Sequence, residues 1–463
     1  MQLKQFFKLF VRAVKGEDLD YTQGSINRAL FMLAVPMILE MLMESLFAIV
    51  DVFLVAGVSN EAVATVGMTE GLLMLVESVA IGIAMATTAL VARRIGEKDF
   101  DQASDVAVQS IILASAVSLV TGFFAFQYAE EILVLMGADQ ALIAEGKEYT
   151  RIILSLNFIL MFLFVFNGIF RAAGNPELAM RTLLLANGIN IVLDPLFIYG
   201  LGPIEGMGVT GAAVATCIGR GSGVAYQLYV LFSNSSSIKL YKKHFKPNLE
   251  ILSKLFRVSL GGAGQFLIST ASWIFLIRIL ASFGSAVLAG YTIAIRIIIF
   301  SILPSWGLSN ATATLVGQNL GAKKPERAEI TVWKAGRYNM IFLLMLSVLF
   351  LLAAKQICGF FTNDTTVIRE AVLCLMIIST GYIFYAYQMI ISQAFNGAGD
   401  TATPTKLNFV FMWLIQIPLA YFLSYYTALE SRGVYVSISL SSVLLTIVAV
   451  YIFRKGNWKK VKV

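Results

Sequence analysis

Three carboxylates lie on one side of the first long apolar stretch of the chain. Glu40, Glu44 and Asp51 interrupt residues 29–56, which are otherwise apolar and long enough to cross a bilayer. At about 100° per residue, a helix brings these positions within roughly 40° of one another. Because a charged side chain at the bilayer centre costs about 2.5–3.5 kcal/mol, the stripe should face the protein interior or a watery cavity. The pattern favours an intramembrane cation site; neutral or paired structural carboxylates are the alternative.

A second polar stripe occurs in the fifth apolar stretch. Asn187, Asn190 and Asp194 share one helical face, and Pro195 follows directly. Because Pro195 has no N–H to donate to the carbonyl of Ile191, that carbonyl oxygen is left beside Asn190. One carboxylate, two amide oxygens and a carbonyl suit a hard cation. Interhelical hydrogen bonding without a ligand is the alternative.

Four more charged residues fall within apolar stretches. Glu70 and Glu77 lie two turns apart on one face of the second stretch, and Arg278 and Arg296 lie in the seventh and eighth. Pairing between such residues is the commoner use of intramembrane charges, so we expect ion pairs here rather than direct transport. Pro36 removes one backbone hydrogen bond from the first stretch and marks a bend point.

Composition places the chain among helical membrane proteins. Apolar residues make up 58 % and charged residues 14 % of the 463 residues, and apolar stretches recur throughout. Stretches of about 20 residues argue against an outer-membrane barrel. Three cysteines and one histidine exclude a disulfide framework and argue against a Cys/His metal site. Neither an ATP-binding motif nor any enzyme signature occurs, so we expect no enzyme, and uphill transport would need an ion gradient.

Loop charges predict the orientation. With a cytoplasmic N-terminus, the cytoplasmic stretches hold 27 Lys/Arg and the opposite stretches 5, which predicts both termini in the cytoplasm. The net charge of +7 therefore reflects orientation and does not indicate nucleic-acid binding. The basic, amphipathic residues 1–20 predict an interfacial helix, or alternatively a disordered tail. The twelve expected transmembrane helices cover residues 29–56, 62–92, 104–127, 150–170, 180–200, 209–233, 252–281, 286–315, 331–354, 370–394, 407–424 and 434–453.

The chain repeats itself at an offset of 225 residues. The segment Leu90–Ala103 recurs as Leu315–Ala328, and Phe170–Asn175 recurs as Phe395–Asp400. Several matches at one offset indicate duplication. The sequence thus predicts an all-α membrane protein with two pseudo-symmetric six-helix bundles and a site at their interface near the midplane. The expected domains are a cytoplasmic segment (1–28), an N-lobe with helices 1–6 (29–233), a basic cytoplasmic linker (234–251), a C-lobe with helices 7–12 (252–453) and a cytoplasmic tail (454–463).

The two halves differ in charge. The offset aligns the three carboxylates with uncharged residues of the second half: Glu40 with Gln265, Glu44 with Ser269 and Asp51 with Leu276. The N-lobe therefore keeps a carboxylate stripe that the C-lobe lacks. We expect the ion chemistry to be concentrated in the N-lobe.

These motifs resemble those of the multidrug and toxic compound extrusion (MATE) transporters, over essentially the whole chain. The residues that carry the resemblance are Pro36 with Ile49-Val-Asp51, Arg94–Lys98, Gly168–Pro176, Asn190–Pro195 and Gly208–Thr216. The resemblance implies a secondary antiporter that exports cationic or amphipathic organic compounds in exchange for Na⁺ or H⁺ by alternating access. It also implies a monomer in the cell inner (plasma) membrane, in contact with lipids and without a cofactor.

Site residues follow from the resemblance to prokaryotic members whose cation site lies in the N-lobe. It implies a cation-coupling site at Asp51, Asn190, Asp194 and Thr216, with Na⁺ as a candidate metal at the first three. Substrate contacts would fall on Glu44, Asn167, Asn187 and Asn190, and the first helix would bend at Pro36 when its aspartate is protonated or cation-loaded.

Other readings stay open. Branches of the family that use acids in the seventh and tenth helices are not matched, because this chain has none there. Glu44 occupies a position often held by an uncharged polar residue, which favours more cationic substrates. A flippase of lipids or lipid-linked saccharides of related fold is one alternative, although the intramembrane excess here is acidic. A membrane protein with a structural role and no transport is the other.

Overall fold

The computed structural model describes residues 3–17, 19–55, 57–233 and 238–461, apart from the side chains of residues 3–4, 47–49, 51–53, 60, 201 and 204. The elements are α1 (Leu3–Lys15), α2 (Ile26–Val55), α3 (Asn60–Gly96), α4 (Phe100–Leu135), α5 (Gln140–Ser155), α6 (Asn157–Ala173), α7 (Pro176–Tyr199), β1 (Gly200–Leu201), β2 (Ile204–Glu205), α8 (Val209–Phe232), η1 (Lys242–Phe245), α9 (Leu249–Ala281), α10 (Ser285–Gly321), α11 (Pro325–Gly359), α12 (Thr365–Thr380), α13 (Tyr382–Gly397), α14 (Ala402–Asn408), η2 (Phe409–Gln416), α15 (Ile417–Tyr425), α16 (Ser431–Arg454) and η3 (Asn457–Lys460).

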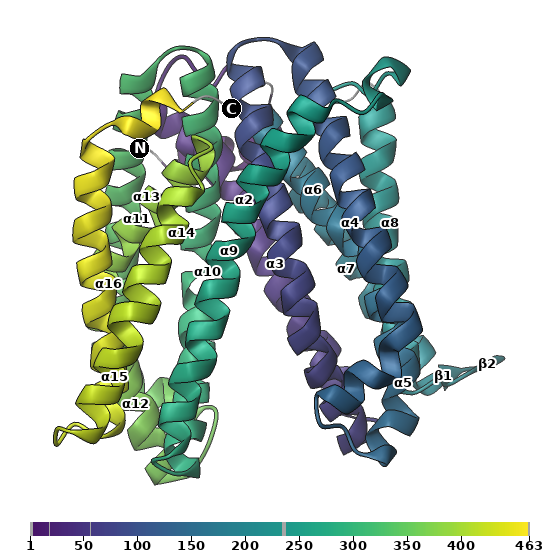
Figure 1. Cartoon of the computed structure of the whole chain (residues 1–463), viewed down its shortest axis with the longest axis vertical. Helices are drawn as coiled ribbons and strands as arrows, with labels where there is room; N and C mark the ends of the chain where they lie inside the picture. The colour runs from purple at the N-terminus through teal and green to yellow at the C-terminus, as the bar shows by residue number, and fades with distance from the viewer. Residues whose placement is uncertain (1–2, 18, 56, 234–237, 462–463) are drawn as a thin grey trace.

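Helices of membrane-spanning length dominate the described residues. Ten stretches are long and apolar enough to cross a bilayer, and α12 with α13, which meet at a bend of 60°, make an eleventh. The 24 residues of α8 are not among these stretches, although they occupy the sixth expected span. The short antiparallel hairpin of β1 and β2 projects from the loop between α7 and α8 (Figure 1). The expectation of an all-α membrane fold is confirmed apart from this hairpin.

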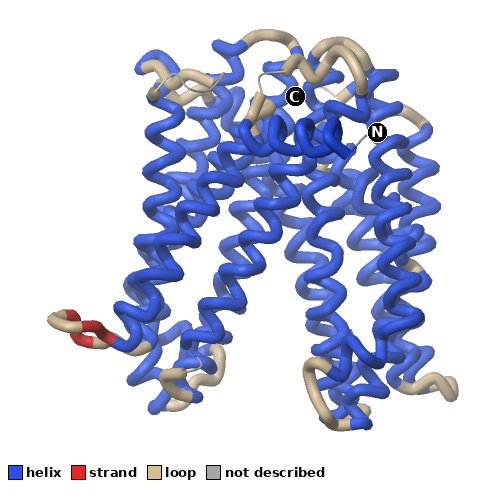
Figure 2. The backbone as a smooth tube through the Cα atoms, turned by 180° about the vertical axis from the view of Figure 1, so that it is seen from behind, coloured by secondary structure: helices blue, strands red, loops and turns tan. Residues whose placement is uncertain are grey.

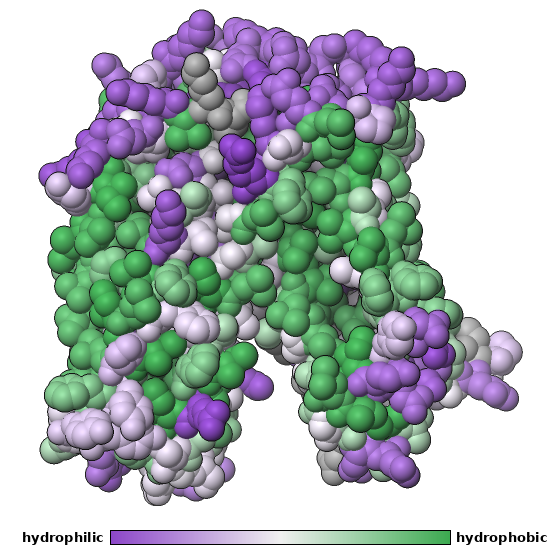
Figure 3. All heavy atoms as spheres, in the orientation of Figure 1, coloured by the Kyte–Doolittle hydropathy of each residue, from purple (hydrophilic) through white to green (hydrophobic). Residues whose placement is uncertain are grey.

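The helices form two groups that diverge from one end of the molecule (Figures 1 and 2). We call α2–α8 the N-terminal bundle and α9–α16 the C-terminal bundle. The two bundles meet at the end that carries both chain termini, and we call this the closed end. At the opposite end a cleft separates them, and on the face in view a mostly apolar surface lies below the hydrophilic closed end (Figure 3).

The two bundles exchange helix segments at the closed end. Leu30, Leu33 and Met37, in the first half of α2, belong to a buried core made with α10, α11, α13 and α16. Reciprocally, Leu255 and Val258, in the first half of α9, belong to the core of the N-terminal bundle. Since α2 and α9 are equivalent in the duplicated sequence, the exchange is pseudo-symmetric.

Paired glycines permit the close crossing of helices between the bundles. A Cβ on Gly96 of α3 would lie 1.9 Å from the carbonyl oxygen of Gln318 in α10, and a Cβ on Gly321 of α10 would lie 2.0 Å from that of Arg93 in α3. Gly96 and Gly321 are separated by the 225-residue offset. Any larger residue would push the two helices apart, because packed backbone cannot yield.

The same symmetry holds one level deeper in the molecule. A Cβ on Gly82 would meet the backbone nitrogen of Ala263 at 2.6 Å, and a Cβ on Gly307 would meet that of Ile38 at 2.7 Å. Both glycines and both partners are again related by 225 residues. The interface between the bundles therefore repeats the duplication contact by contact.

An N-terminal strap (residues 19–25) crosses the closed end. The Tyr21 hydroxyl donates to the carbonyl of Gly174, at the end of α6, over 3.3 Å. From the other bundle, the Arg327 guanidinium donates to three strap carbonyls at 2.8–3.3 Å, and Lys324 Nζ donates to a fourth at 3.0 Å. The strap thus binds both bundles where they meet.

Candidate functional site

The polar stripe of α7 forms a buried pair inside the N-terminal bundle. Asn190 and Asp194 are 1 % and 0 % exposed, and Asn190 Nδ2 donates to Asp194 Oδ1 over 2.9 Å. Their separation of four residues places them on adjacent turns of the helix. The buried Oδ1 of Asn190 accepts no hydrogen bond from any described residue. An unsatisfied buried acceptor of this kind costs about 1–3 kcal/mol, which a cation or water at this point would offset.

The other predicted cation ligands come from α8 and α2. Thr216 is buried, one turn before Gly219 of α8. At Gly219 α8 packs closely on α7, because a Cβ added there would lie 2.8 Å from the Cβ of Asn190. Asp51 lies in α2, but its side chain is outside the described residues. Among the described side chains, no three His, Cys, Asp or Glu groups converge.

The predicted substrate contacts occupy two different environments. Asn187 Nδ2 donates to the backbone carbonyl of Met43 over 2.8 Å and so ties α7 to the middle of α2. The side chain of Glu44 is 41 % exposed, with Oε1 3.7 Å from Arg220 Nη2 of α8. Pro36 is buried within α2, seven residues before Met43. Glu44 is thus open to a ligand, whereas the Asn187 amide nitrogen already has a backbone partner.

Asn167 belongs to a buried network that the sequence analysis missed. Its Nδ2 donates to Glu40 Oε1 over 3.1 Å, and its Oδ1 accepts from Gln227 Nε2 over 2.6 Å. Glu40 is 1 % exposed and lies 3.7 Å from Arg171 Nη1. The sequence signal is the four-residue spacing of Asn167 and Arg171, although Arg171 falls just outside the expected helix 150–170.

The four residues proposed for ion pairs form none within 4.0 Å among the described residues. Arg278, in the last turn of α9, is exposed. Arg220, which has no role in the predicted site, lies 3.7 Å from Glu44.

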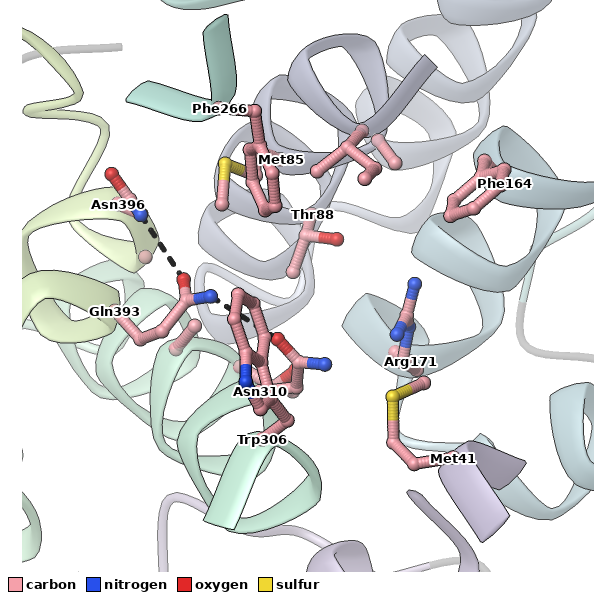
Figure 4. A pocket seen from close by; sticks show the side chains of 15 residues that line it. Met41, Met85, Thr88, Phe164, Arg171, Phe266, Trp306, Asn310, Gln393 and Asn396 are labelled. Atoms are coloured by element: carbon pink, nitrogen blue, oxygen red, sulfur yellow. Dashed lines mark hydrogen bonds between the residues drawn. The ribbon is translucent and has the colours of Figure 1, made fainter. Parts of the chain in front are cut away.

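A cavity of about 140 Å³ lies where the two bundles meet (Figure 4). Arg171, Met41 and Phe164 line it from the N-terminal bundle, while Trp306 and Asn310 face it from α10. A second cavity of about 230 Å³ adjoins it and shares Met85, Phe266, Trp306, Gln393 and Asn396. Among the described side chains, none of the predicted site residues lines either cavity. The lining instead includes Phe164 in the first cavity and Tyr385 and Met389 in the second, in line with the many aromatic and methionine residues of the sequence.

Comparison with known proteins agrees with the fold and the duplication. The family model MatE matches the chain twice, at residues 36–196 and 263–422. The probable multidrug resistance protein NorM of Thermotoga maritima is 26 % identical over 94 % of both chains. The multidrug export protein MepA of Staphylococcus aureus (strain MRSA252) is 22 % identical, covering 89 % of this chain and 90 % of MepA.

Solved structures superpose over nearly the full length. A crystal structure of MATE in the bent conformation matches with a TM-score of 0.89 and 28 % identity, covering 97 % of this chain and 98 % of that one. A transporter of the MOP superfamily from Pyrococcus furiosus, described as having a binding pocket of reversed polarity, matches with the same score and identity over 96 % and 100 %. These matches confirm the twelve-helix architecture. The chain belongs to the MatE family, whose members are membrane transporters and not enzymes.

Proposed function

We propose that the protein is a secondary active multidrug exporter that exchanges Na⁺ or H⁺ for cationic or amphipathic organic compounds. Family membership and the names of NorM and MepA support multidrug export. The observation that carries ion coupling is the fully buried Asp194, bonded to Asn190 inside the N-terminal bundle. A carboxylate so far from water is stable only when a proton, a cation or another partner compensates its charge.

Coupling requires that the ion favour one conformation over the other. We propose that Asp51, Asn190, Asp194 and Thr216 hold it, with Na⁺ as the candidate metal. The ion-loaded carboxylates escape the desolvation penalty that empty ones suffer, so α2 bends at Pro36 only in the loaded state. The lobes 29–233 and 252–453, joined by the linker 234–251, then rock about their shared interface.

The organic cation would bind on the acidic side of the cleft. Glu44 is 41 % exposed and lies 3.7 Å from Arg220, a separation too long for a hydrogen bond. An organic cation can therefore contact the Glu44 carboxylate, with Asn167, Asn187 and Asn190 as polar neighbours. With both termini in the cytoplasm of a monomer in the inner membrane, the open cleft faces outward, which is the side of release.

The test is ethidium efflux from proteoliposomes under an imposed Na⁺ or H⁺ gradient. Efflux under one gradient that is lost in Asp51→Asn and Asp194→Asn, but kept in the control Glu131→Gln on the exposed surface of α4, supports the proposal. Undiminished efflux in both Asn variants contradicts the cation site. Absence of efflux under either gradient contradicts export of this class of cation.

A lipid or lipid-linked-saccharide flippase is the second candidate. It is favoured by one observation, the Arg171 guanidinium at the central cavity, where a phosphate would find a partner. Movement of a fluorescent phospholipid between leaflets of the same proteoliposomes, without ethidium efflux, would favour this candidate.

A further inference from the structure

Arg171 presents unused hydrogen-bond donors to the central cavity. Its Nε donates to the carbonyl of Asn167 over 3.2 Å, one turn back on α6. Its Nη1 lies 3.7 Å from Glu40, which is too far for a hydrogen bond, and neither terminal nitrogen donates a hydrogen bond to a described residue. In Figure 4 the side chain lies at the cavity, across from Trp306 and Asn310. The side chain of Arg171 is 12 % exposed and Glu40 lies buried beside it, so the guanidinium faces the cavity with its counter-charge shielded from the cavity.

The cavity wall opposite Arg171 also carries a hydrogen-bond donor, at the end of a chain of amide side chains. Four amide side chains form a chain of hydrogen bonds: Gln265, Asn396, Gln393 and Asn310. The backbone carbonyl of Thr401 can only accept, and it accepts from Gln265 Nε2 over 3.2 Å. This fixes the orientation of each amide in turn, because every link needs one donor and one acceptor.

The hydrogen bond between Gln393 and Asn310 determines which group of Asn310 remains available to a ligand. Gln393 Nε2 donates to Asn310 Oδ1 over 3.3 Å, so the remaining group of Asn310 is its Nδ2, which donates to no described residue. Figure 4 shows Asn310 beside Trp306, on the wall opposite Arg171. Arg171 and Asn310 therefore provide donors from different bundles to one space.

The rest of the lining is mostly apolar, and the buried Thr314 hydroxyl has no hydrogen-bond partner among the described residues. Met41, Met85 and Phe164 line the cavity, and the rings of Phe266 and Trp306 lie 5.9 Å apart beside it. No Asp or Glu lines either cavity among the described residues. An organic cation would find no counter-charge here, whereas an acid group would find a guanidinium fork and an amide N–H.

We propose that this cavity is a subsite for the acid group of aromatic, amphipathic compounds. The carboxylate binds the terminal nitrogens of Arg171 and the Nδ2 of Asn310, and the ring system packs against Trp306, Phe266 and the methionines. Because the two donors belong to different bundles, the bound acid favours the conformation that holds both walls together. The subsite rests on the proposed export function, and it widens the substrate range to acids and zwitterions.

The test compares two probes with the same ring system in the purified, full-length protein. Equilibrium dialysis measures binding of 1-pyrenebutyrate, which carries a carboxylate, and of 1-pyrenebutanol, which does not. We expect tighter binding of the acid to the wild type. We also expect a loss of about tenfold or more in Arg171→Gln and a smaller loss in Asn310→Leu, with the alcohol unaffected, since hydrogen bonds between charged groups are stronger than those between neutral groups.

Two further variants keep the outcome interpretable. Glu40→Gln/Arg171→Gln removes both members of the buried pair and leaves no uncompensated charge, so it should fold where the single variant does not. Arg369→Gln, on the exposed side of α12, is the matched control and should bind as the wild type does. Equal affinity of the two probes for the wild type, or acid binding undiminished in the double variant, overturns the subsite.

Ethidium efflux in the same preparations separates this inference from the proposed function. Efflux that persists in proteins without preference for the acid overturns the subsite alone. Preference for the acid in a protein that exports no ethidium upholds the subsite and contradicts the export of cations.

Discussion

A single methyl group at Gly96 should shift the conformational equilibrium of the transporter. A Cβ there would lie 1.9 Å from the Gln318 carbonyl oxygen, while real Cβ contacts below 3.0 Å are essentially unknown. The backbones of α3 and α10 would therefore have to separate by at least 1.1 Å, the difference between these distances. In the proposed alternating-access mechanism the closed end must part, so Gly96→Ala would penalise the conformation in which it is closed.

The size of the effect follows from the cost of overpacking. Inserting a methyl group into a well-packed contact costs about 1–3 kcal/mol, and here neither partner is a side chain that can turn away. A free-energy difference of that size shifts a two-state equilibrium about 5- to 150-fold. The conformation with a parted closed end and a closed cleft should gain population by that factor.

Single-molecule distance measurement across the cleft would detect this shift. Dyes at Gly137, between α4 and α5, and at Asn363, between α11 and α12, report the separation of the bundles. We expect Gly96→Ala to shorten it. Gly67→Ala, in the same helix with nothing within 4 Å of the new Cβ, is the control and should leave it unchanged. An unaltered distance with only a lower Tm would show that the α3–α10 contact stabilises the fold without parting during transport.

Three further predictions concern the cation site and the strap. Asp194→Asn should abolish the Tm response to the coupling ion, measured in NaCl against choline chloride and at low against high pH; an undiminished response would exclude Asp194 as a ligand. Arg327→Gln removes three hydrogen bonds to the strap and should speed its proteolysis severalfold, whereas the exposed Arg337→Gln should not. The hydrogen bond from Arg12 lowers the pKa of Glu17 below its ordinary value of 4.5, with a further contribution from Arg28. Its stabilising contribution is therefore complete above pH 4.5 and lost as pH falls through the lower native value, so hydrogen exchange around the strap should rise only in acid.

The sequence predicted the elements well because the bilayer dictates their length. Apolar stretches of about 20 residues can hardly be anything but spanning helices, and the 225-residue offset aligned the glycines that later proved to be equivalent contacts. The exchange of α2 and α9 between bundles was not foreseen. An apolar face shows that a helix is buried, but it does not show which bundle buries it.

Within the candidate site, helical spacing indicates which residues share a face of one helix, but not which residues of different helices touch. The bond between Asn190 and Asp194 follows from helical spacing alone. The contact of Glu40 with Arg171 joins residues 131 positions apart on α2 and α6. Helical spacing relates only residues of one helix, so it cannot predict this contact. Arg171 also lies just outside the expected helix 150–170, among residues that sequence alone places in a loop. The role of Asp51 stays a prediction, because its side chain is outside the described residues.

The duplication supplies the sharpest argument for where the chemistry lies. Glu40 and Arg171 correspond at the 225-residue offset to Gln265 and Asn396, and each pair joins equivalent helices. In the second half, Gln265 and Asn396 form two reciprocal hydrogen bonds between their side-chain amides, at 2.9 and 3.2 Å. Such a neutral, hydrogen-bonded pair costs little to bury. In the first half the same two positions hold a buried ion pair, which is costly and often replaceable without loss of stability.

Replacing the Glu40–Arg171 pair by the amide pair found in the second half tests whether the buried ion pair serves ligand binding or stability. Glu40→Gln/Arg171→Asn should keep the fold and a Tm close to that of the wild type, because the C-terminal bundle already packs this pair. It should abolish the preference for 1-pyrenebutyrate over 1-pyrenebutanol, because the guanidinium is gone. A large drop in Tm with the preference retained would make the ion pair a structural element of α2 and α6, and the cavity would then recognise its ligands by the amide chain and aromatic walls alone.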